Sequence, residues 1–472
     1  MRVILIRPPK VQGALERSMV QHPVNLLMLA AVLEKSGFQC EVWDFEVQDF
    51  SGEIVREKTG RSNPGLAGIT ALTCNIKTAN TIMGWIKSES PETFTVVGGP
   101  HVSAIPERTL EEFANFDAVV VGEGELTLAE ICARISKGRG LEGVLGTAWR
   151  RSSSPVIEDP RPPMDNLDEL PYPARHLIDH SLYKGASSPG LDATLHRSTE
   201  LFTTRGCPDR CSFCASHLVF GRKVRARSAE HVLGEVDQCM SKWGYRHYTV
   251  DDDTFTYRPS RLFDLCRGFK ERGITWDCDT RVNAVNREMI QMMADSGCQK
   301  IAFGVESGSP RILKLIHKEI TLDQIRNAFQ WAHEAGIITT AFFMVASHPS
   351  ETKEDLEMSL KLMKEIDTEL MAVAVAVPYP GTELYRIMKN GDYIDEERWE
   401  TFNHLHSIPS WHTENFSGRK LVRLQNRLFR QFFIRPSFIW KTLPKAMSWH
   451  GFKYYTRSFL DILKYLFIEK RI

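Results

Sequence analysis

Three cysteines of this 472-residue chain lie close enough in sequence to bind one metal centre. They are Cys207, Cys211 and Cys214, within the sequence GCPDRCSFC. Thiolates at this spacing on one loop can bind three irons of a [4Fe–4S] cluster and leave the fourth iron open to an external ligand. A zinc site completed by His217 is the alternative, because zinc takes four such ligands at similar spacings. The other cysteines are scattered, so a disulfide framework is not expected.

The cysteines directly follow the first strand of a regular series of expected strands and helices. The six apolar runs that predict these strands occupy residues 201–205, 247–251, 275–279, 300–305, 339–346 and 371–377. The glycines that follow four of the intervening helices fit left-handed C-caps: Gly244, Gly273, Gly297 and Gly336. Thr321 and Gln324 fit a capping box at the start of another helix. Six βα units predict a partial parallel (β/α)6 barrel, whose functional residues lie at the carboxyl ends of the strands.

A second α/β domain is expected before the barrel. Its short apolar strands are predicted at residues 2–6, 40–45, 66–70, 94–98 and 117–121. Together with the helical patterns between them, these strands predict a doubly wound, Rossmann-like parallel sheet with helices on both faces. Ligands bind such sheets beyond the carboxyl ends of the strands. Two of the turns expected there are rich in glycine: Gly98-Gly99-Pro100-His101 and Gly122-Glu123-Gly124-Glu125.

The sequence therefore predicts an α/β protein in four parts. Residues 1–140 form the doubly wound domain, and residues 141–200 form a hairpin and a Pro-rich linker in which closely spaced prolines exclude a long helix. Residues 201–400 form the barrel, and residues 401–472 form a helical C-terminal segment. The first apolar run is too short for a signal peptide and no run is long enough to span a membrane, so a soluble cytoplasmic protein is expected.

The cysteine motif, with Phe213 before its last cysteine and a six-unit barrel after it, resembles the radical S-adenosylmethionine (SAM) superfamily over residues 201–400. The resemblance implies that the open iron chelates SAM and that one electron cleaves SAM to a 5′-deoxyadenosyl radical. It also implies cosubstrate contacts at the later strand ends, from Asp251, Asp252, Arg281, Glu306, Ser307 and Tyr379. At the fifth strand end the chain departs from the family, because Ala346-Ser347-His348-Pro349 replaces the usual Gly-rich turn.

Two of these residues have a clear physical interpretation. The guanidinium of Arg281 could pair with the methionyl carboxylate through two parallel hydrogen bonds, which lysine cannot do. Glu306 could accept hydrogen bonds from the ribose hydroxyls or the amino group of SAM. A surface cation is the alternative for Arg281, and a structural buried ion pair is the alternative for Glu306.

The N-terminal domain resembles the cobalamin-binding domain that is fused to one large subclass of radical SAM enzymes. The resemblance rests on Thr70, Leu72 and Thr73 and on the two Gly-rich turns, where the backbone could pack closely against a corrin. A domain kept only as a scaffold is the alternative. Because the D-x-H-x-x-G sequence that supplies an axial histidine elsewhere is absent, bound cobalamin is expected to lack a side-chain nitrogen ligand. His101 is the only obvious candidate for such a ligand.

The C-terminal segment has a charge unlike that of the remaining chain. The whole chain is neutral, with 59 Lys and Arg against 59 Asp and Glu, which gives no overall reason to expect a nucleic-acid partner. Residues 419–472 nevertheless contain 13 Lys and Arg, 2 Asp and Glu, and 12 aromatic residues. Cations interleaved with aromatic rings predict peripheral contact with an anionic surface, here the inner face of the membrane. A helical cap on the barrel with a solvated basic face is the alternative.

Taken together, the two domains resemble the group that includes the anaerobic magnesium-protoporphyrin monomethyl ester cyclases and carbon methyltransferases. The resemblance implies methylation of an unactivated carbon of a small hydrophobic substrate, with a [4Fe–4S] cluster, SAM and cobalamin as cofactors and flavodoxin or ferredoxin as electron donor. Radical oxidative cyclisation or rearrangement of a tetrapyrrole or lipid-like substrate is one alternative, and a cobalamin or redox sensor is another. Sulfur transfer to tRNA is disfavoured, because Cys40, Cys74 and Cys132 lack the spacing of a second cluster.

Overall fold

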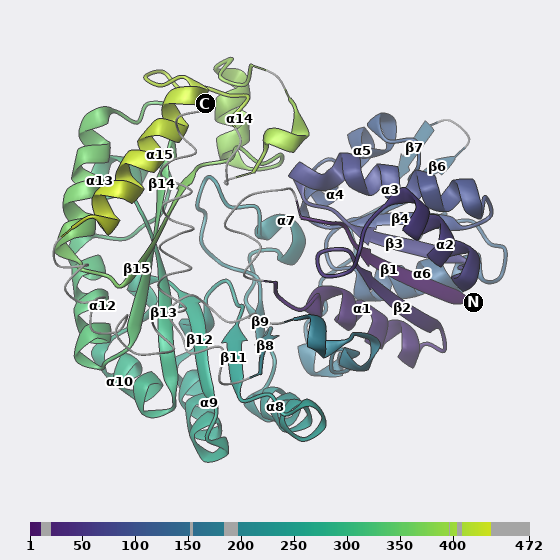
Figure 1. Ribbon diagram of the computed structural model, residues 1–472, viewed down its shortest axis with the longest axis horizontal. Helices are drawn as coiled ribbons and strands as arrows, with labels where there is room; N and C mark the ends of the chain where they lie inside the picture. Colours follow the sequence, from purple (N-terminus) through teal and green to yellow (C-terminus); the bar gives the residue numbers. More distant parts are fainter. Residues whose placement is uncertain (11–19, 152–153, 184–196, 396, 404–407, 436–472) are drawn as a thin grey trace.

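Two α/β bodies lie side by side in the computed structural model (Figure 1). The structure describes residues 1–10, 20–151, 154–183, 197–395, 397–403 and 408–435. The first body is built on a seven-stranded sheet and the second on a six-stranded sheet, and a two-stranded ribbon is inserted between the first two strands of the second body.

The sheet of the first body has the strand order β2-β1-β3-β4-β5-β6-β7. Its strands are β1 (Arg2–Arg7), β2 (Gln39–Asp44), β3 (Leu66–Thr70), β4 (Phe94–Gly98), β5 (Ala118–Val120), β6 (Thr147–Arg151) and β7 (Ser154–Ile157). The first five are parallel, as predicted, and the order reverses between β1 and β3. The expected hairpin forms as β6 and β7 and joins this sheet in antiparallel pairing, so the sheet extends past residue 140.

Helices cover both faces of this first sheet. They are α1 (Val24–Lys35), α2 (Gly52–Ser62), α3 (Ile76–Glu89), α4 (Pro100–Ala104), α5 (Pro106–Glu112) and α6 (Glu125–Ile135). Alternate residues of β1 enter different cores: Val3 belongs to the core that contains Leu27 of α1, whereas Ile4 belongs to the core that contains Ile82 of α3. Burial on both faces explains why the strands are almost continuously apolar.

The second body is an open barrel of six parallel strands in the order β8-β11-β12-β13-β14-β15. They are β8 (Ser198–Leu201), β11 (His247–Val250), β12 (Thr275–Thr280), β13 (Cys298–Glu306), β14 (Ile338–Val345) and β15 (Leu370–Val375). Five of the six lie where the sequence predicts them. The prediction of a first strand at 201–205 is wrong, because β8 ends at Leu201 and Thr204–Arg205 instead forms β9, paired with β10 (Arg225–Ala226).

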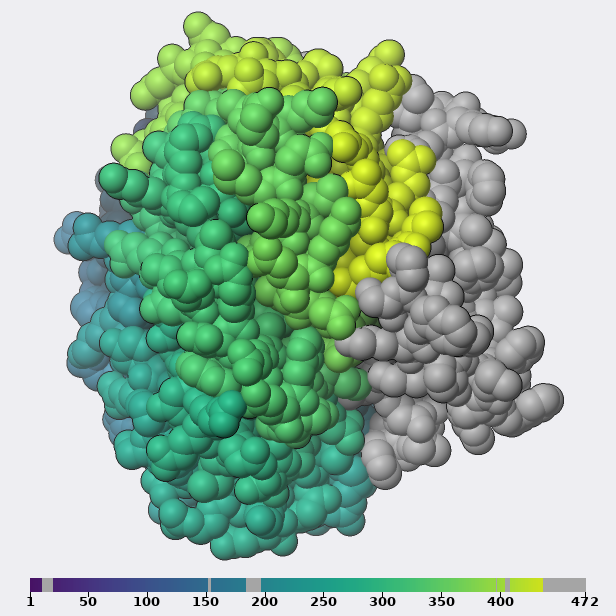
Figure 2. All heavy atoms as spheres, turned by 90° about the vertical axis from the view of Figure 1, so that its left-hand side faces the viewer, coloured from purple at the N-terminus to yellow at the C-terminus, as the bar shows by residue number. Residues whose placement is uncertain are grey.

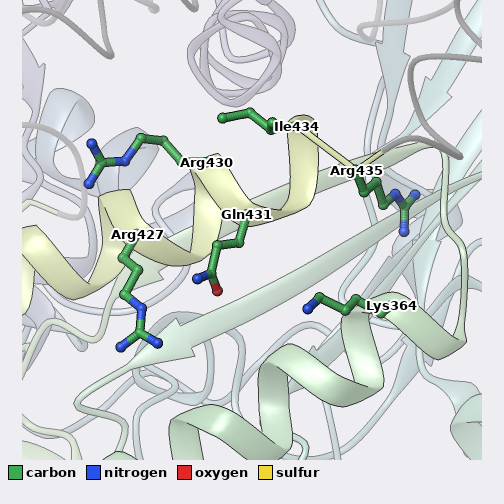
Figure 3. Close-up of a pocket in the computed structure, with 6 residues that line it drawn as sticks. All are labelled: Lys364, Arg427, Arg430, Gln431, Ile434 and Arg435. Atoms are coloured by element: carbon green, nitrogen blue, oxygen red, sulfur yellow. The ribbon is translucent and has the colours of Figure 1, made fainter.

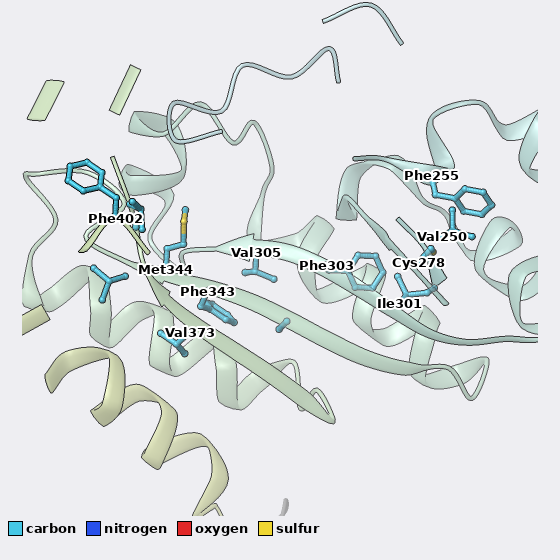
Figure 4. Close-up of a cluster of buried hydrophobic side chains, with 14 of the residues drawn as sticks. Val250, Phe255, Cys278, Ile301, Phe303, Val305, Phe343, Met344, Val373 and Phe402 are labelled. Atoms are coloured by element: carbon cyan, nitrogen blue, oxygen red, sulfur yellow. The ribbon is translucent and has the colours of Figure 1, made fainter. Parts of the chain in front are cut away.

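The helices of the second body surround the barrel (Figure 1). They are α7 (His217–Phe220), α8 (Ala229–Trp243), α9 (Pro259–Arg272), α10 (Arg287–Asp295), α11 (Pro310–Leu315), α12 (Leu322–Glu334), α13 (Lys353–Glu365), α14 (Glu383–Asn390) and α15 (Gly418–Phe433). The four C-cap glycines all have positive φ, and the Thr321 capping box is present, as predicted. Outward-facing side chains of the strands, among them Phe303 and Phe343, form a core with these helices (Figure 4).

Helix α15 closes the free edge of the barrel beside β15. Its buried face carries Leu421, Leu424 and Leu428. The side-chain amide of Gln425 donates to the Val373 carbonyl oxygen at 2.7 Å, which satisfies an acceptor on an edge strand. This helix agrees with the expected helical cap, whereas residues 436–472 of the basic segment lie outside the described residues. No described helix is both long and apolar enough to cross a membrane.

Candidate active site

The cysteine loop lies at the carboxyl end of the barrel, where the sequence predicts it. It leaves β9 at Gly206 and is held by two backbone hydrogen bonds of one residue. The Ser212 amide donates to the Ile316 carbonyl at 3.0 Å, and the Ser212 carbonyl accepts from the Leu384 amide at 2.8 Å. The loop is therefore fixed between the segments that follow β13 and β15. All three cysteines are half-buried free thiols.

Two charged side chains lie directly beside these thiols. The Cys207 thiol donates to the Asp209 carboxylate at 3.4 Å, and the Arg281 guanidinium lies 3.4 Å from the Cys211 sulfur. Arg281 also pairs with Asp209 at 3.2 Å. Burial raises the pKa of the Cys207 thiol to about 11 and raises that of Cys214. Thiols of this kind become metal ligands by releasing their protons to solvent as the metal binds.

The loop offers three sulfur ligands but no preformed fourth. Within the described part of the chain, no three His, Cys, Asp or Glu side chains already converge as metal ligands do. His217 is the fourth ligand of the alternative zinc site. Its Nδ1 atom is 3.0 Å from the carbonyl oxygen of Cys214 and is engaged in a hydrogen bond with it. Three thiols on one loop with an open fourth position fit a [4Fe–4S] cluster better than a closed zinc shell.

Behind the cysteine loop lies a buried ion pair that contains one predicted residue and one unpredicted residue. Lys318 Nζ is 2.8 Å from Glu306 Oε1, and both residues are nearly inaccessible to solvent. Glu306 has a φ of 68°, an uncommon conformation for a residue other than glycine. The Lys318 ammonium is 6.0 Å from the centre of the Phe213 ring, and the Lys318 carbonyl accepts a hydrogen bond from Arg281. Phe213 and Arg281 thus connect this pair to the cysteines.

The aspartates that follow β11 have three separate environments. Asp252 accepts hydrogen bonds from the backbone amides of Thr203 and Thr204 at 2.6 and 2.9 Å, so it holds the turn before the cysteine loop. Asp253 accepts from the Ser216 hydroxyl at 2.5 Å. Burial, followed by the nearby Asp279 carboxylate, raises the pKa of Asp251 to about 7. Among these three aspartates, only Asp251 has the Asp279 carboxylate as its main electrostatic neighbour.

The remaining predicted cosubstrate residues, Ser307 and Tyr379, differ in their exposure to solvent. Ser307 is fully buried, and its hydroxyl is 3.3 Å from that of Ser359 in α13, so it packs within the barrel wall. Tyr379 is partly buried against the core, and burial raises the pKa of its phenol. Cys74 of the first body also raises the pKa of this phenol, after burial. The loop after β15 therefore reaches the carboxyl edge of the first sheet.

That carboxyl edge has the close backbone approach expected of a ligand site. Gly99 has a φ of 113°, and an added Cβ would lie 2.7 Å from the Ala71 carbonyl oxygen. Thr70 and Thr73 flank this point, and between them Leu72 is 53% exposed. Leu72 follows β3, one of the two strands between which the order reverses, and an exposed leucine there, beside the glycine turn that follows β4, fits a large apolar ligand such as a corrin ring.

His101 is buried beside this turn. Its Nδ1 atom is 3.2 Å from the Thr73 hydroxyl, and its Nε2 atom has no hydrogen-bond partner within the described residues. The Trp399 ring packs edge-on against the imidazole, with the ring centres 5.2 Å apart. Burial, together with the Arg108 cation, lowers the pKa of His101 to about 4. The imidazole is therefore neutral at physiological pH and covered by another ring.

The second Gly-rich turn contacts the barrel. Gly122 has a φ of 76°, and Gly124 packs against Leu29. Glu123 and Glu125 both pair with Arg205, the residue before the cysteine loop, at 2.9 and 2.5 Å. Glu123 and Glu125 are predicted cobalamin contacts, and in the described structure both carboxylates pair with a residue of the barrel body.

An open parallel barrel with a three-cysteine loop, facing the ligand edge of a doubly wound domain, defines the class of radical enzymes with a second cofactor domain. Comparison with known proteins supports this class. The Radical SAM superfamily model matches residues 201–363, and the B12 binding domain model matches residues 14–132.

Relatives extend the match over nearly the whole chain. An uncharacterized methyltransferase of Pyrococcus horikoshii is 32% identical over 96% of this chain and 96% of its own length. An anaerobic magnesium-protoporphyrin IX monomethyl ester cyclase of Rubrivivax gelatinosus is 26% identical over 93% of this chain and 78% of its own. The solved structure of the radical SAM methyltransferase TsrM from Kitasatospora setae, with cobalamin and a [4Fe–4S] cluster bound, shares the fold: TM-score 0.67, 20% identity, 83% of this chain and 78% of that chain.

The chain belongs to the family of cobalamin-dependent radical SAM enzymes. Its cofactors are a [4Fe–4S] cluster, SAM and cobalamin, as the sequence predicts. The roles of the individual residues at these sites remain predictions, with the contacts described above.

Proposed function

We propose that this enzyme methylates an unactivated carbon of a small hydrophobic molecule. When bound, the cluster and SAM supply a carbon-centred radical, and cobalamin supplies a methyl group. The observation that carries the proposal is that the two predicted cofactor edges meet. Helix α7, which follows the cysteines, packs against α4, which begins within the Gly98–His101 turn. A Cβ at Gly381 would lie 2.9 Å from Leu218 of α7 and 3.1 Å from Ala104 of α4.

The chain's own side chains would position SAM at this interface and keep it apart from bulk water. Arg281 is only 7% exposed and already lies beside Cys211, so its guanidinium can hold a carboxylate next to the cluster. The Pyrococcus relative, which aligns over the same length, is itself named a methyltransferase. These points support methyl transfer across the domain interface.

The test is a product analysis under anaerobic conditions. Reconstituted enzyme is reduced and incubated with SAM deuterated in its methyl group and with a lipid extract of the source cells. We expect 5′-deoxyadenosine, S-adenosylhomocysteine and a deuterium-labelled product that mass spectrometry identifies. Substrate consumption with 5′-deoxyadenosine but without S-adenosylhomocysteine would refute methyl transfer.

That second outcome defines the other candidate function, radical oxidative cyclisation of a tetrapyrrole or lipid-like substrate. The observation in its favour is the cyclase relative, which aligns over 93% of this chain. Magnesium-protoporphyrin monomethyl ester is the direct substrate to test. Formation of neither SAM product would instead point to the sensor.

We further propose that the enzyme is cytoplasmic, takes its electron from flavodoxin or ferredoxin, and touches the inner membrane surface through α15. Lys420, Arg423, Arg427 and Arg430 recur along this helix on the side next to its buried leucines, and Arg427 also pairs with Glu357 of α13 at 2.7 Å. A hollow of about 660 Å³ beside the helix is lined by Lys364, Arg427, Arg430, Gln431, Ile434 and Arg435 (Figure 3). Figure 2 shows α15 on the surface of the barrel. Clustered cations next to an exposed apolar side chain suit anionic headgroups.

Two measurements test these partners. Replacing Lys420, Arg423 and Arg430 by glutamine should reduce sedimentation with phosphatidylglycerol vesicles, since each cation near such a surface contributes about 1 kcal/mol. Glutamine at the exposed α9 residues Arg267 and Lys270 is the control and should leave sedimentation unchanged. Equal binding by both variants and by a chain lacking residues 436–472 would end the membrane proposal.

Reduced flavodoxin or ferredoxin should replace dithionite in forming 5′-deoxyadenosine, and failure of both would exclude them as donors.

A further inference from the structure

Two carboxylates of the cobalamin-binding domain form ion pairs with the residue from which the cysteine loop begins. Arg205 directly precedes Gly206 and Cys207, and its guanidinium forms ion pairs with Glu123, at 2.9 Å, and Glu125, at 2.5 Å. The second oxygen of Glu123 pairs with Arg225. These contacts join residues that are at least 80 positions apart in the chain.

The two arginines lie at the two ends of one loop. Arg205 of β9 pairs in register with Arg225 of β10, so the ribbon closes a neck around the segment that carries all three cysteines. The neck is narrow: an added Cβ at Gly206 would lie 2.4 Å from the Lys223 carbonyl oxygen. Whatever fixes these two arginines also fixes where the cysteine loop leaves the barrel.

The turn that presents the carboxylates is itself held in place. The Gly122 amide donates to the Ser103 hydroxyl of α4 at 3.0 Å. An added Cβ at Gly122 would lie 3.6 Å from the Val219 carbonyl of α7, so the turn touches the helix that follows the cysteines. The Gly-rich turn is therefore packed against both the start and the end of the cysteine motif.

This contact is buried, unlike the ion pair of Lys77 and Glu400 between the same two bodies. The side chains of Arg205, Arg225, Glu123 and Glu125 are all at most 13% exposed. Burial opposes the charge of Arg205, yet the two carboxylates outweigh it and raise the pKa of the guanidinium. By contrast, the Lys77–Glu400 pair between the same two bodies is about half exposed on both sides and is screened by water.

We propose that Glu123 and Glu125 are positioning residues that clamp the neck of the cysteine loop to the cobalamin-binding domain, and are not cobalamin ligands. The clamp sets the position of the cluster relative to the ligand edge of the first sheet. The inference rests on the family assignment alone and does not require that the enzyme transfers a methyl group.

The test compares a clamp variant, E123Q/E125Q, with the control E400Q, which removes a carboxylate from the exposed pair. Each protein is reconstituted anaerobically with iron, sulfide and hydroxocobalamin, and the bound iron and cobalamin are quantified. Hydrogen–deuterium exchange is then followed in peptides that cover residues 205–225, and the reduced cluster is examined by EPR. An E123D/E125D variant, which keeps both charges, tests rescue.

We expect the clamp variant to retain iron and cobalamin at the wild-type level. Exchange in the loop should rise at least tenfold and the EPR signal of the reduced cluster should change, whereas E400Q should match the wild type and the aspartate variant should recover in part. Loss of cobalamin with unchanged loop exchange would overturn the proposal and make the carboxylates cobalamin contacts. Unchanged exchange with unchanged cobalamin would also overturn it.

A clamp variant that fails to fold would be replaced by E123Q/E125Q/R205Q, which removes charge from both sides and leaves a smaller uncompensated charge at the neck. The same loop exchange and cobalamin content decide the outcome for that variant.

Discussion

Variants of the buried pair of Glu306 and Lys318 can show whether Glu306 is a structural carboxylate or a cosubstrate ligand. Its atoms are 2.8 Å apart, and the side chains are 9% and 7% exposed. Replacing Lys318 by methionine leaves the Glu306 carboxylate buried without its partner, and E306Q leaves the ammonium in the same position. Both changes are expected to destabilise the barrel.

The size of the effect follows from this burial. Removal of one partner from a buried ion pair costs about 3–5 kcal/mol, because the other charge has lost its water and gains nothing in return. Removal of both charges together costs far less, so E306Q/K318M should be much more stable than the sum of the single changes implies. K364M, at an exposed lysine, is the control and should change stability by no more than about 0.5 kcal/mol.

Urea unfolding of the reduced protein without cofactors, followed by circular dichroism, measures these stabilities. SAM binding to each reconstituted variant is measured separately by the EPR change of the reduced cluster. If the single losses simply add in the double variant, the pair does not interact and our interpretation is refuted. A stable E306Q protein that no longer binds SAM would instead make Glu306 a cosubstrate ligand, as the sequence suggests.

Three further outcomes are expected. Because the pKa of Asp251 is raised to about 7, the folded protein keeps a proton that the unfolded chain releases above pH 4, and the stability of the protein falls as pH rises towards 7. Asp251→Asn should therefore stabilise the protein at pH 8 by up to about 4 kcal/mol but leave its stability at pH 4 unchanged. A stabilisation that is the same at both pH values would contradict this. The Co(II) EPR spectrum should show no side-chain nitrogen on cobalt, since His101 is covered, and a nitrogen splitting that His101→Ala removes would refute it. Gly99→Ala should lower both stability and bound cobalamin, because its Cβ would meet a backbone oxygen, whereas Gly138→Ala, with a positive φ but open space, should cost only about 1–2 kcal/mol and no cobalamin; equal effects would exclude the close approach as the cause.

The elements that the sequence predicts correctly are those whose signals are local. Strands β1 to β5 are buried on both faces, which makes their apolar runs visible, and Thr321 caps its helix through residues only three positions away. The cysteine loop is found by its spacing alone. In these places the neighbours along the chain decide the structure.

The features that sequence reasoning missed depend on distant partners. Residues 204–205 look like the end of a strand, and only pairing with residues 225–226 moves them into the ribbon. The pairing of Glu123 and Glu125 with Arg205 joins residues at least 80 positions apart, and no local signal indicates it. Lys318 follows a helix with no motif around it, and no sequence signal marks it as the partner of Glu306.

The most direct test of the account is the yield of 5′-deoxyadenosine from SAM after one-electron reduction of the reconstituted protein. We predict that the wild-type enzyme forms 5′-deoxyadenosine and that a variant with alanine at Cys207, Cys211 and Cys214 forms none, although it still binds cobalamin. Equal yields from the two proteins, or no 5′-deoxyadenosine from wild-type enzyme with a full cluster, would contradict the account.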